Sequence, residues 1–182
     1  MSGQQLTNED DECVRRYLKG DASAFEVLYE RYRLRLYAYL TRSVSGNGVA
    51  DELFQDVWVK VIASLPRYSR QGRFRSWLFS CAHNVLVDHY RKQRPVESGD
   101  AGEAAEPLRE DMPEAGEVRQ RIEAALASLT FDQRQAFYLR AELGCSMKEI
   151  AEVQQCSLEA GRSRLRAAYA TLQAQLRDFR DE

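Results

Sequence analysis

Residues 95–117 interrupt an otherwise helical chain, and this interruption constrains the fold more than any other feature. The segment PVESGDAGEAAEPLREDMPEAGE contains eight acidic residues against one basic residue, Arg109, and three of the four prolines. A segment with so much charge and so little apolar surface stays extended or disordered. We therefore predict a flexible acidic linker between two domains, residues 1–94 and residues 118–182.

Both flanking parts carry apolar residues at helical spacing. The clearest stripe consists of Phe25, Leu28, Tyr29, Tyr32, Leu36, Tyr39 and Leu40. Comparable patterns predict further helices over residues 8–19, 49–65, 74–92, 118–129, 130–142 and 157–176, with a short helix after Ser146. Gly20, Gly46, Pro66 and Gly144 break the pattern between helices. The sequence therefore predicts an all-α fold of two small helical domains.

The overall composition favours a soluble globular protein. Of the 182 residues, 44% are hydrophobic and 30% are charged, and the formal net charge is -2. The sequence has no run of about 18 apolar residues that could span a membrane. Its acidic start, MSGQQLTNEDDE, does not resemble a secretory signal. We therefore expect a cytoplasmic protein without direct membrane insertion.

The cysteines and histidines do not form a pattern typical of a metal site. Cys13, Cys81, Cys145 and Cys156 form no CxxC pair, and no histidine lies at zinc-ligand spacing from them. Small buried side chains in a reducing compartment are the favoured interpretation, with a redox switch or a metal site as the alternatives. The sequence also lacks a convincing nucleophile–base pair or phosphate loop. We therefore expect no metal, no cofactor and no enzymatic activity.

Residues 67–94 concentrate positive charge and aromatic rings. The stretch holds seven basic residues against one acid, Asp88, in a chain that is negative overall. Cations that follow a phosphate backbone and rings that stack on splayed bases are what binding to a single-stranded nucleic acid requires. Helical spacing predicts that Trp77 is mostly buried, whereas Tyr68 and Phe74 are better placed to meet a base.

The helix predicted over residues 49–65 has an acidic side that includes a tryptophan. This side carries Asp51, Glu52, Gln55, Asp56, Trp58 and Lys60. An exposed tryptophan is unusual in plain solvent, and tryptophan is frequent as an interface anchor. The pattern supports a partner-binding face and a half-buried core tryptophan equally.

Residues 146–176 have the pattern of two helices joined by a short turn. Ser146 and Glu149 have the spacing of a capping box, and Ser157 can cap the second helix. Such a pair is typical of a helix-turn-helix, whose second helix enters the major groove of DNA. The residues that would face bases or phosphates are Glu159, Ala160, Arg162, Ser163 and Arg166.

Two parts of the sequence resemble one protein family. The string VADELFQDVWVKVIASLPRY, followed by GRFRSWLFSCAHNVLVDHYRKQR, resembles region two of bacterial sigma factors of the small extracytoplasmic function (ECF) type. The string LASLTFDQRQAFYLRAELGCSMKEIAEV, followed by SRLRAAYATLQ, is similar to their region four. The resemblance implies a region 2 helical bundle and a region 4 helix-turn-helix domain, with the acidic linker threading toward the polymerase active centre.

The resemblance also implies a function: a promoter-specificity subunit that binds core RNA polymerase and helps to melt promoter DNA. It implies a surface for the clamp helices of the largest polymerase subunit at Asp51, Glu52, Gln55, Asp56 and Trp58. It implies contacts with the melted minus-ten element at Arg67, Tyr68, Arg73, Phe74, Arg75, Trp77, Asn84, Asp88, His89, Arg91 and Lys92. It implies contacts with the double-stranded minus-thirty-five element at Ser157, Glu159, Ala160, Arg162, Ser163, Arg164 and Arg166. A contact with the polymerase flap region and an anti-sigma factor are further implied partners.

The second domain departs from the pattern of this family at the helix-turn-helix. Gln154 and Gln155 stand where the family has an apolar residue and a glycine, and Gly161 stands where it has a larger apolar residue. Because a left-handed backbone costs a glutamine more than a glycine, we expect a looser turn than usual. Two other functions stay open: a stand-alone helix-turn-helix regulator and a helical protein-interaction adaptor.

Overall fold

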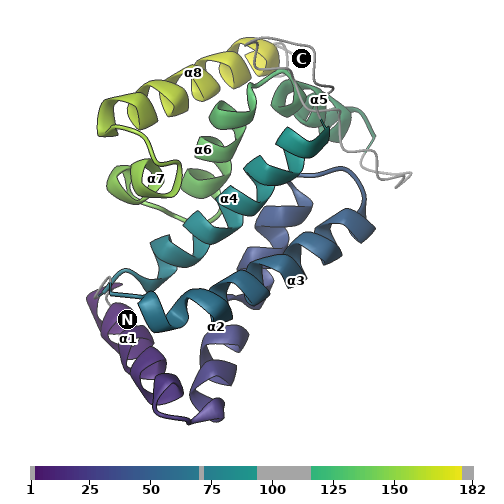
Figure 1. The fold of residues 1–182 in the computed structure, drawn as a ribbon. Helices are drawn as coiled ribbons and strands as arrows, with labels where there is room; N and C mark the ends of the chain where they lie inside the picture. Colours follow the sequence, from purple (N-terminus) through teal and green to yellow (C-terminus); the bar gives the residue numbers. More distant parts are fainter. Residues whose placement is uncertain (1–2, 70–71, 94–115, 178–182) are drawn as a thin grey trace.

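The computed structural model describes residues 3–69, 72–93 and 116–177, apart from the side chains of residues 3–8 and 117–119. All regular elements within these ranges are helices (Figure 1). The first part of the chain forms α1 (Gly3–Leu18), α2 (Ala22–Thr41), α3 (Asn47–Ser64), the single 3-10 turn η1 (Leu65–Arg67) and α4 (Phe74–Gln93). The second part forms α5 (Gly116–Ala127), α6 (Phe131–Ala141), α7 (Met147–Val153) and α8 (Leu158–Leu176). The prediction of an all-α fold is confirmed.

Several helices begin at a side chain that caps their first turn, and the predicted caps Ser146 and Ser157 are confirmed. Asp21 accepts a hydrogen bond from the backbone N–H of Ser23 at the start of α2. Thr130 and Ser146 each form a complete capping box, and the Ser157 hydroxyl accepts from the N–H of Ala160 at 3.1 Å. These bonds satisfy N–H groups that a helix leaves without partners in its first turn.

The first four helices bury an aromatic and aliphatic core. Leu28, Leu36 and Tyr39 of α2 are buried together with Phe79 and Leu86 of α4. Their spacing of three, seven or eight residues places them on one side of each helix. One side of α4 therefore packs against α1, α2 and α3.

The two parts of the chain pack directly on each other. One cluster of buried side chains continues from α4 into the second part, where it includes Leu139 and Ile150. α7 lies against α4, and α6, α7 and α8 form the neighbouring bundle (Figure 1). The predicted linker, residues 95–117, lies outside the described residues except for the first two residues of α5. This close packing of the two parts was not predicted from the sequence.

The turn of the helix-turn-helix is well packed rather than loose. Gln155 has the left-handed backbone expected at this position, with φ of 50°. Gln154 is buried, and its side-chain amide donates to the carbonyl of Asp132 at 2.8 Å while its oxygen accepts from Arg164. Gly161 is buried against α7. These hydrogen bonds offset the cost of the left-handed backbone at Gln155. The sequence pattern alone could not indicate these bonds.

The four cysteines, all within the described ranges, form no disulfide bonds. Cys13 and Cys145 are buried as expected, whereas Cys81 and Cys156 are half-buried. In the described part of the chain, no group of His, Cys, Asp or Glu is placed to hold a metal ion. None of the helices described is long and apolar enough to cross a membrane.

Candidate nucleic-acid interface

The basic loop before α4 is held in place by α1. Asp11 accepts a hydrogen bond from the Tyr68 hydroxyl at 3.0 Å and another from the backbone N–H of Gly72. Gly72 has a φ of 73°, which a residue with a Cβ adopts only at a cost. Asp11 therefore contacts the loop on both sides of residues 70–71, and the nearby side chains of Arg67 and Arg73 are exposed.

The aromatic residues at the start of α4 form one cluster. Phe74 is fully buried, with its ring centroid 5.7 Å from both Tyr32 and Trp77. The expectation that Phe74 meets a base is therefore wrong, because the first turn of α4 points this ring into the core. Tyr68 and Trp77 are half-buried and lie 4.9 Å apart between centroids, so these two rings keep accessible surface.

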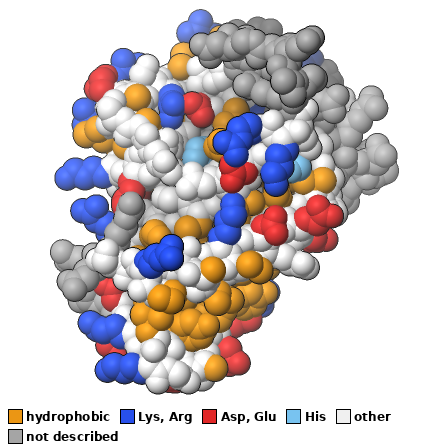
Figure 2. All heavy atoms as spheres, in the orientation of Figure 1, with side chains coloured by type: hydrophobic (Ala, Val, Ile, Leu, Met, Phe, Trp, Pro, Cys, Tyr) orange, Lys and Arg blue, Asp and Glu red, His pale blue; other side chains and the backbone are white. Residues whose placement is uncertain are grey.

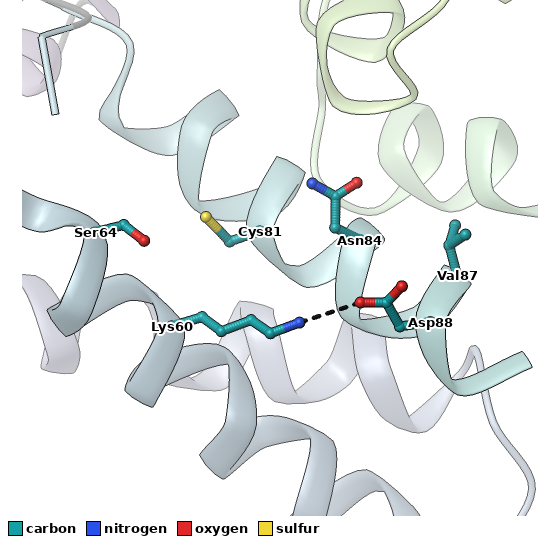
Figure 3. Close-up of a pocket in the computed structure, with 6 residues that line it drawn as sticks. All are labelled: Lys60, Ser64, Cys81, Asn84, Val87 and Asp88. Atoms are coloured by element: carbon teal, nitrogen blue, oxygen red, sulfur yellow. Dashed lines mark hydrogen bonds and ion pairs between the residues drawn. The ribbon is translucent and has the colours of Figure 1, made fainter. Parts of the chain in front are cut away.

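The outer face of α4 carries polar and basic side chains. Asn84, Arg91 and Lys92 are exposed, and His89 is half-buried beside Gln93. Asp88 forms ion pairs with Lys60 of α3 at 3.3 Å and with Arg91 at 3.0 Å. An open groove between α3 and α4 is lined by Lys60, Ser64, Cys81, Asn84, Val87 and Asp88 (Figure 3). The Asp88 carboxylate therefore holds the side chains of Lys60 and Arg91 beside this groove.

The acidic side of α3 is exposed, but Trp58 is not part of its surface. Trp58 is only 6% exposed, and its ring contacts Phe25 and Tyr29 of α2 at centroid distances of 5.6 and 5.0 Å. The interpretation of Trp58 as an exposed anchor is therefore wrong, because aromatic residues of α2 cover it. Asp51, Glu52, Gln55 and Asp56 are all exposed.

Sequence reasoning missed two apolar residues on α3. Val59 is 66% exposed and Ile62 is 40% exposed. Figure 2 shows hydrophobic side chains gathered on the lower part of the visible face, where α3 lies, with Lys and Arg side chains along its middle. Both residues lie outside the apolar stripe that this helix buries. The helical periodicity could therefore have predicted that they are exposed.

The N-terminal half of α8 presents most of the residues predicted to read duplex DNA. Ser157, Glu159, Arg162, Ser163 and Arg166 are exposed, and Ala160 is half-buried. Glu159 lies 3.8 Å from both Arg162 and Arg166, a separation at which ion pairs are weak. Arg164 is engaged elsewhere, because it pairs with Asp132 of α6 at 2.5 Å.

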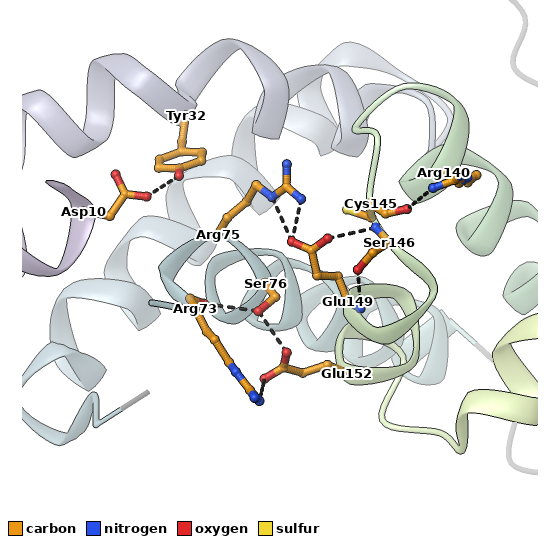
Figure 4. A network of polar contacts seen from close by, with 10 residues as sticks. All are labelled: Asp10, Tyr32, Arg73, Arg75, Ser76, Arg140, Cys145, Ser146, Glu149 and Glu152. Atoms are coloured by element: carbon orange, nitrogen blue, oxygen red, sulfur yellow. Dashed lines mark hydrogen bonds and ion pairs between the residues drawn. The ribbon is translucent and has the colours of Figure 1, made fainter. Parts of the chain in front are cut away.

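Several predicted minus-ten residues contact the second part of the chain. Arg75 pairs with Glu149 of α7, and Arg73 lies beside Glu152 of the same helix (Figure 4). Asn84 accepts a hydrogen bond from the side chain of Gln155 at 2.8 Å. The basic surface of α4 is therefore partly covered in this arrangement.

His83 lies on the covered side of α4. Its ring stacks on Phe131 of α6 with centroids 5.7 Å apart, and Nδ1 lies 3.4 Å from the Tyr39 hydroxyl. Burial lowers the pKa of His83 to about 4. His83 therefore has a structural role in the core between the two parts of the chain.

Comparison with known proteins agrees with this geometry. The Sigma-70 region 2 family matches residues 28–96, which include α3, α4 and the basic loop. The Sigma-70 region 4 family matches residues 119–172, which include the helix-turn-helix. The RNA polymerase sigma-H factor of Pseudomonas aeruginosa is 31% identical over 174 residues, covering 88% of this chain and 90% of the relative. The chain belongs to the sigma-70 family.

Other relatives specify the type of sigma factor. The ECF RNA polymerase sigma factor SigK of Mycobacterium tuberculosis is 29% identical over 175 residues, covering 92% of this chain and 94% of the relative. The sigma factor RpoE of Bartonella quintana, solved with the anti-sigma factor NepR, has a TM-score of 0.68 at 23% identity, covering 84% of this chain and 96% of that chain. This sigma factor is thus of the ECF type, and its fold is that of solved sigma factors.

Proposed function

We infer that this sigma factor binds core RNA polymerase and directs it to promoters through two DNA surfaces. The first, here called the strand surface, consists of residues 67–69, 72 and 73 of the basic loop and the polar outer face of α4. The second is the exposed start of α8. The single observation that carries this proposal is the pair of accessible rings, Tyr68 and Trp77, beside exposed cations at the end of an anchored loop.

The strand surface would capture an unpaired base of the minus-ten element. Unstacking a base costs a few kcal/mol. Stacking on an aromatic side chain returns about 1–3 kcal/mol, and phosphate contacts add attraction. Arg67, Arg91 and Lys92 would supply these contacts, while the groove beside Asn84 and Asp88 would accommodate the strand along α4. The free energy gained on capturing the base therefore roughly offsets the cost of unstacking it. No covalent chemistry is required of the protein.

The exposed start of α8 would dock in the major groove of the minus-thirty-five element. Arg162 and Arg166 can bond guanine edges or phosphates, and Ser163 can bond either. Glu159 can accept from a cytosine amino group once the weak ion pairs with these arginines open. Arg164 would support the reading helix from behind through Asp132 rather than touch DNA.

The exposed acidic face of α3 would bind the clamp helices of the polymerase. Asp51, Glu52, Gln55 and Asp56 supply charge and hydrogen-bond acceptors, and Val59 supplies apolar area beside them. Trp58 would act from beneath, by fixing α3 against α2. The domain of residues 118–182 would contact the flap region, and the acidic linker of residues 95–117 would connect the two domains within the polymerase.

An inhibitory protein is a further proposed partner. The solved RpoE is bound to an anti-sigma factor, and this chain shares its fold. We extend that class of partner to this sigma factor, which would act in the bacterial cytoplasm beside polymerase and DNA.

Transcription in vitro with core polymerase tests the proposal. The variant R91A/K92A removes two exposed cations of the strand surface, and R15A/R33A removes one arginine from a surface ion pair in each of α1 and α2 as a matched control. We expect promoter-specific transcripts with wild type and control, and a loss of at least tenfold with R91A/K92A.

Two outcomes would reject the proposal. Failure of the wild-type chain to associate with core polymerase, together with tight binding to duplex DNA, would favour the stand-alone regulator. Equal transcription from R91A/K92A and its control would show that the strand surface does not serve this function.

A further inference from the structure

Two neighbouring acids of α1 bind two different parts of the first domain. The first, Asp10, is only 1% exposed; it accepts a hydrogen bond from the Tyr32 hydroxyl at 2.5 Å and pairs with Arg31 (Figure 4). Tyr32 and Arg31 both belong to α2. Because a buried polar group is costly to leave without its partner, these bonds hold α1 in a fixed position against α2.

The second acid, Asp11, is turned toward the basic loop. Its Oδ1 accepts from the Tyr68 hydroxyl at 3.0 Å, and its Oδ2 accepts from the backbone N–H of Gly72. The backbone N–H of Arg73 also faces the Tyr68 hydroxyl. One carboxylate thus binds two points of the loop, and the Tyr68 hydroxyl lies between this carboxylate and the first turn of α4.

Aromatic neighbours hold the other end of the Tyr68 side chain. The centroid of its ring lies 5.9 Å from that of Phe74 and 4.9 Å from that of Trp77. Burial and the bond to Asp11 raise the pKa of the Tyr68 hydroxyl, so it remains protonated and donates at neutral pH. The ring is therefore fixed both by packing and through its hydroxyl. A side chain that is already ordered loses less conformational entropy when a base stacks on it.

A carboxylate is an unexpected group beside a loop that attracts phosphates. Its negative charge opposes the approach of a nucleic-acid strand. Both oxygens of Asp11, however, accept hydrogen bonds from the loop, and bonds to an ionised acceptor are stronger than those to a neutral one. This arrangement suits a group that orders the loop rather than one that attracts DNA.

Building on the proposed function, we propose that Asp11 is a positioning residue for base capture. It holds the Tyr68 ring in the orientation that stacks on an unpaired base, and it acts through Tyr68 and the backbone of Gly72 without touching DNA. The step that depends on Asp11 is therefore the opening of the promoter. Association with core polymerase does not depend on it, because the proposed polymerase surface lies on α3.

Two substitutions of Asp11 separate the hydrogen bonds from the charge. Asp11→Ala removes both bonds. In Asp11→Asn, the side-chain oxygen can still accept from Gly72, and the amide can donate to the Tyr68 hydroxyl, which is also an acceptor. These bonds are neutral and weaker. Glu12→Ala is the matched control, because Glu12 is the next acid of the same helix and forms an exposed pair with Arg15.

The test is transcription in vitro by core polymerase with each full-length variant on two templates. One is a duplex promoter, and the other carries mismatches that keep its minus-ten region unpaired. On the duplex, we expect about tenfold less transcript with Asp11→Ala than with Glu12→Ala, and about threefold less with Asp11→Asn. On the unpaired template, the three variants should give nearly equal yields, because opening is no longer required. Their affinities for core polymerase should be equal.

Two outcomes would overturn the role of Asp11. The first is equal transcription from the duplex promoter with Asp11→Ala and Glu12→Ala. The second is a loss of the same size on both templates or a weaker association with core polymerase, which would assign Asp11 a general structural role. If Asp11→Ala does not fold, Asp11→Asn supports the same comparison. Failure of the proposed function is distinguishable, because the wild-type chain would then give no promoter-specific transcripts with core polymerase.

Discussion

His83 predicts a pH dependence of stability that follows from its position between the two domains. The imidazole is only 5% exposed, and burial is the main reason that its pKa falls from the ordinary 6.5 to about 4. Asp132 opposes this change and Arg164 adds to it, and both belong to the second domain. The neutral ring is therefore the form that fits between Tyr39 and Phe131.

The sign of the effect follows from which state binds more protons. The unfolded chain protonates His83 near pH 6.5, whereas the folded chain resists protonation down to about pH 4. Stability from this residue is therefore complete above pH 6.5 and falls as the pH drops toward 4. The full loss is roughly 3.4 kcal/mol, of which about 1.3 kcal/mol falls between pH 7.5 and 5.5.

Urea denaturation at pH 7.5 and 5.5 measures this loss. Wild type is compared with His83→Phe, which keeps a stacking ring but cannot titrate, and with His89→Gln as a control at the other histidine. The free energy of unfolding should fall by about 1.3 kcal/mol more in wild type than in His83→Phe. An identical pH dependence in these two proteins would refute the assignment of His83 as a buried neutral group.

Two further predictions concern α8 and α3. Gly161→Ala should raise the free energy of unfolding by about 0.5–1 kcal/mol, because glycine is a poor helix former. The added Cβ would lie 3.7 Å from Ala151 Cβ, which is an ordinary contact. A lower urea midpoint than that of wild type would contradict the close fit described for this turn. The variant E52A/D56A should weaken association with core polymerase about tenfold in a titration, roughly 1.4 kcal/mol. The control E12A/E30A should bind core polymerase as wild type does. Equal affinities of the two variants would show that the acidic face of α3 does not bind the polymerase.

Local features of this fold could be predicted from the sequence because their causes are local. Ser146 and Ser157 cap helices through backbone groups three residues away, so their spacing in the sequence was sufficient to predict them. The left-handed backbone at Gln155 was implied by the resemblance to the sigma factor family, which has a glycine at this position. The hydrogen bonds that stabilise the turn involve Asp132 of α6 and Arg164 of α8, and they could not be found in the same way.

The errors concern aromatic residues at the edge of a helical stripe. Phe74 and Trp58 lie at the edge of an apolar stripe, where helical spacing does not decide between burial and exposure. Whether such a side chain is buried depends on the aromatic rings that a neighbouring helix places over it. Tyr32 and Tyr29 of α2 cover them. The contacts between α4 and α7 were also invisible, because they join segments separated by the acidic linker.

Strand opening at a promoter tests the account most directly. Permanganate reactivity of unpaired thymines in the minus-ten region should be compared for polymerase carrying wild type, Tyr68→Phe and Tyr68→Ala. Both variants lose the bond to Asp11, but only Tyr68→Ala loses the ring. We expect strong reactivity with wild type, a modest decrease with Tyr68→Phe and a loss of at least tenfold with Tyr68→Ala. Equal reactivity with Tyr68→Phe and Tyr68→Ala would contradict capture of a base by the ring of this residue.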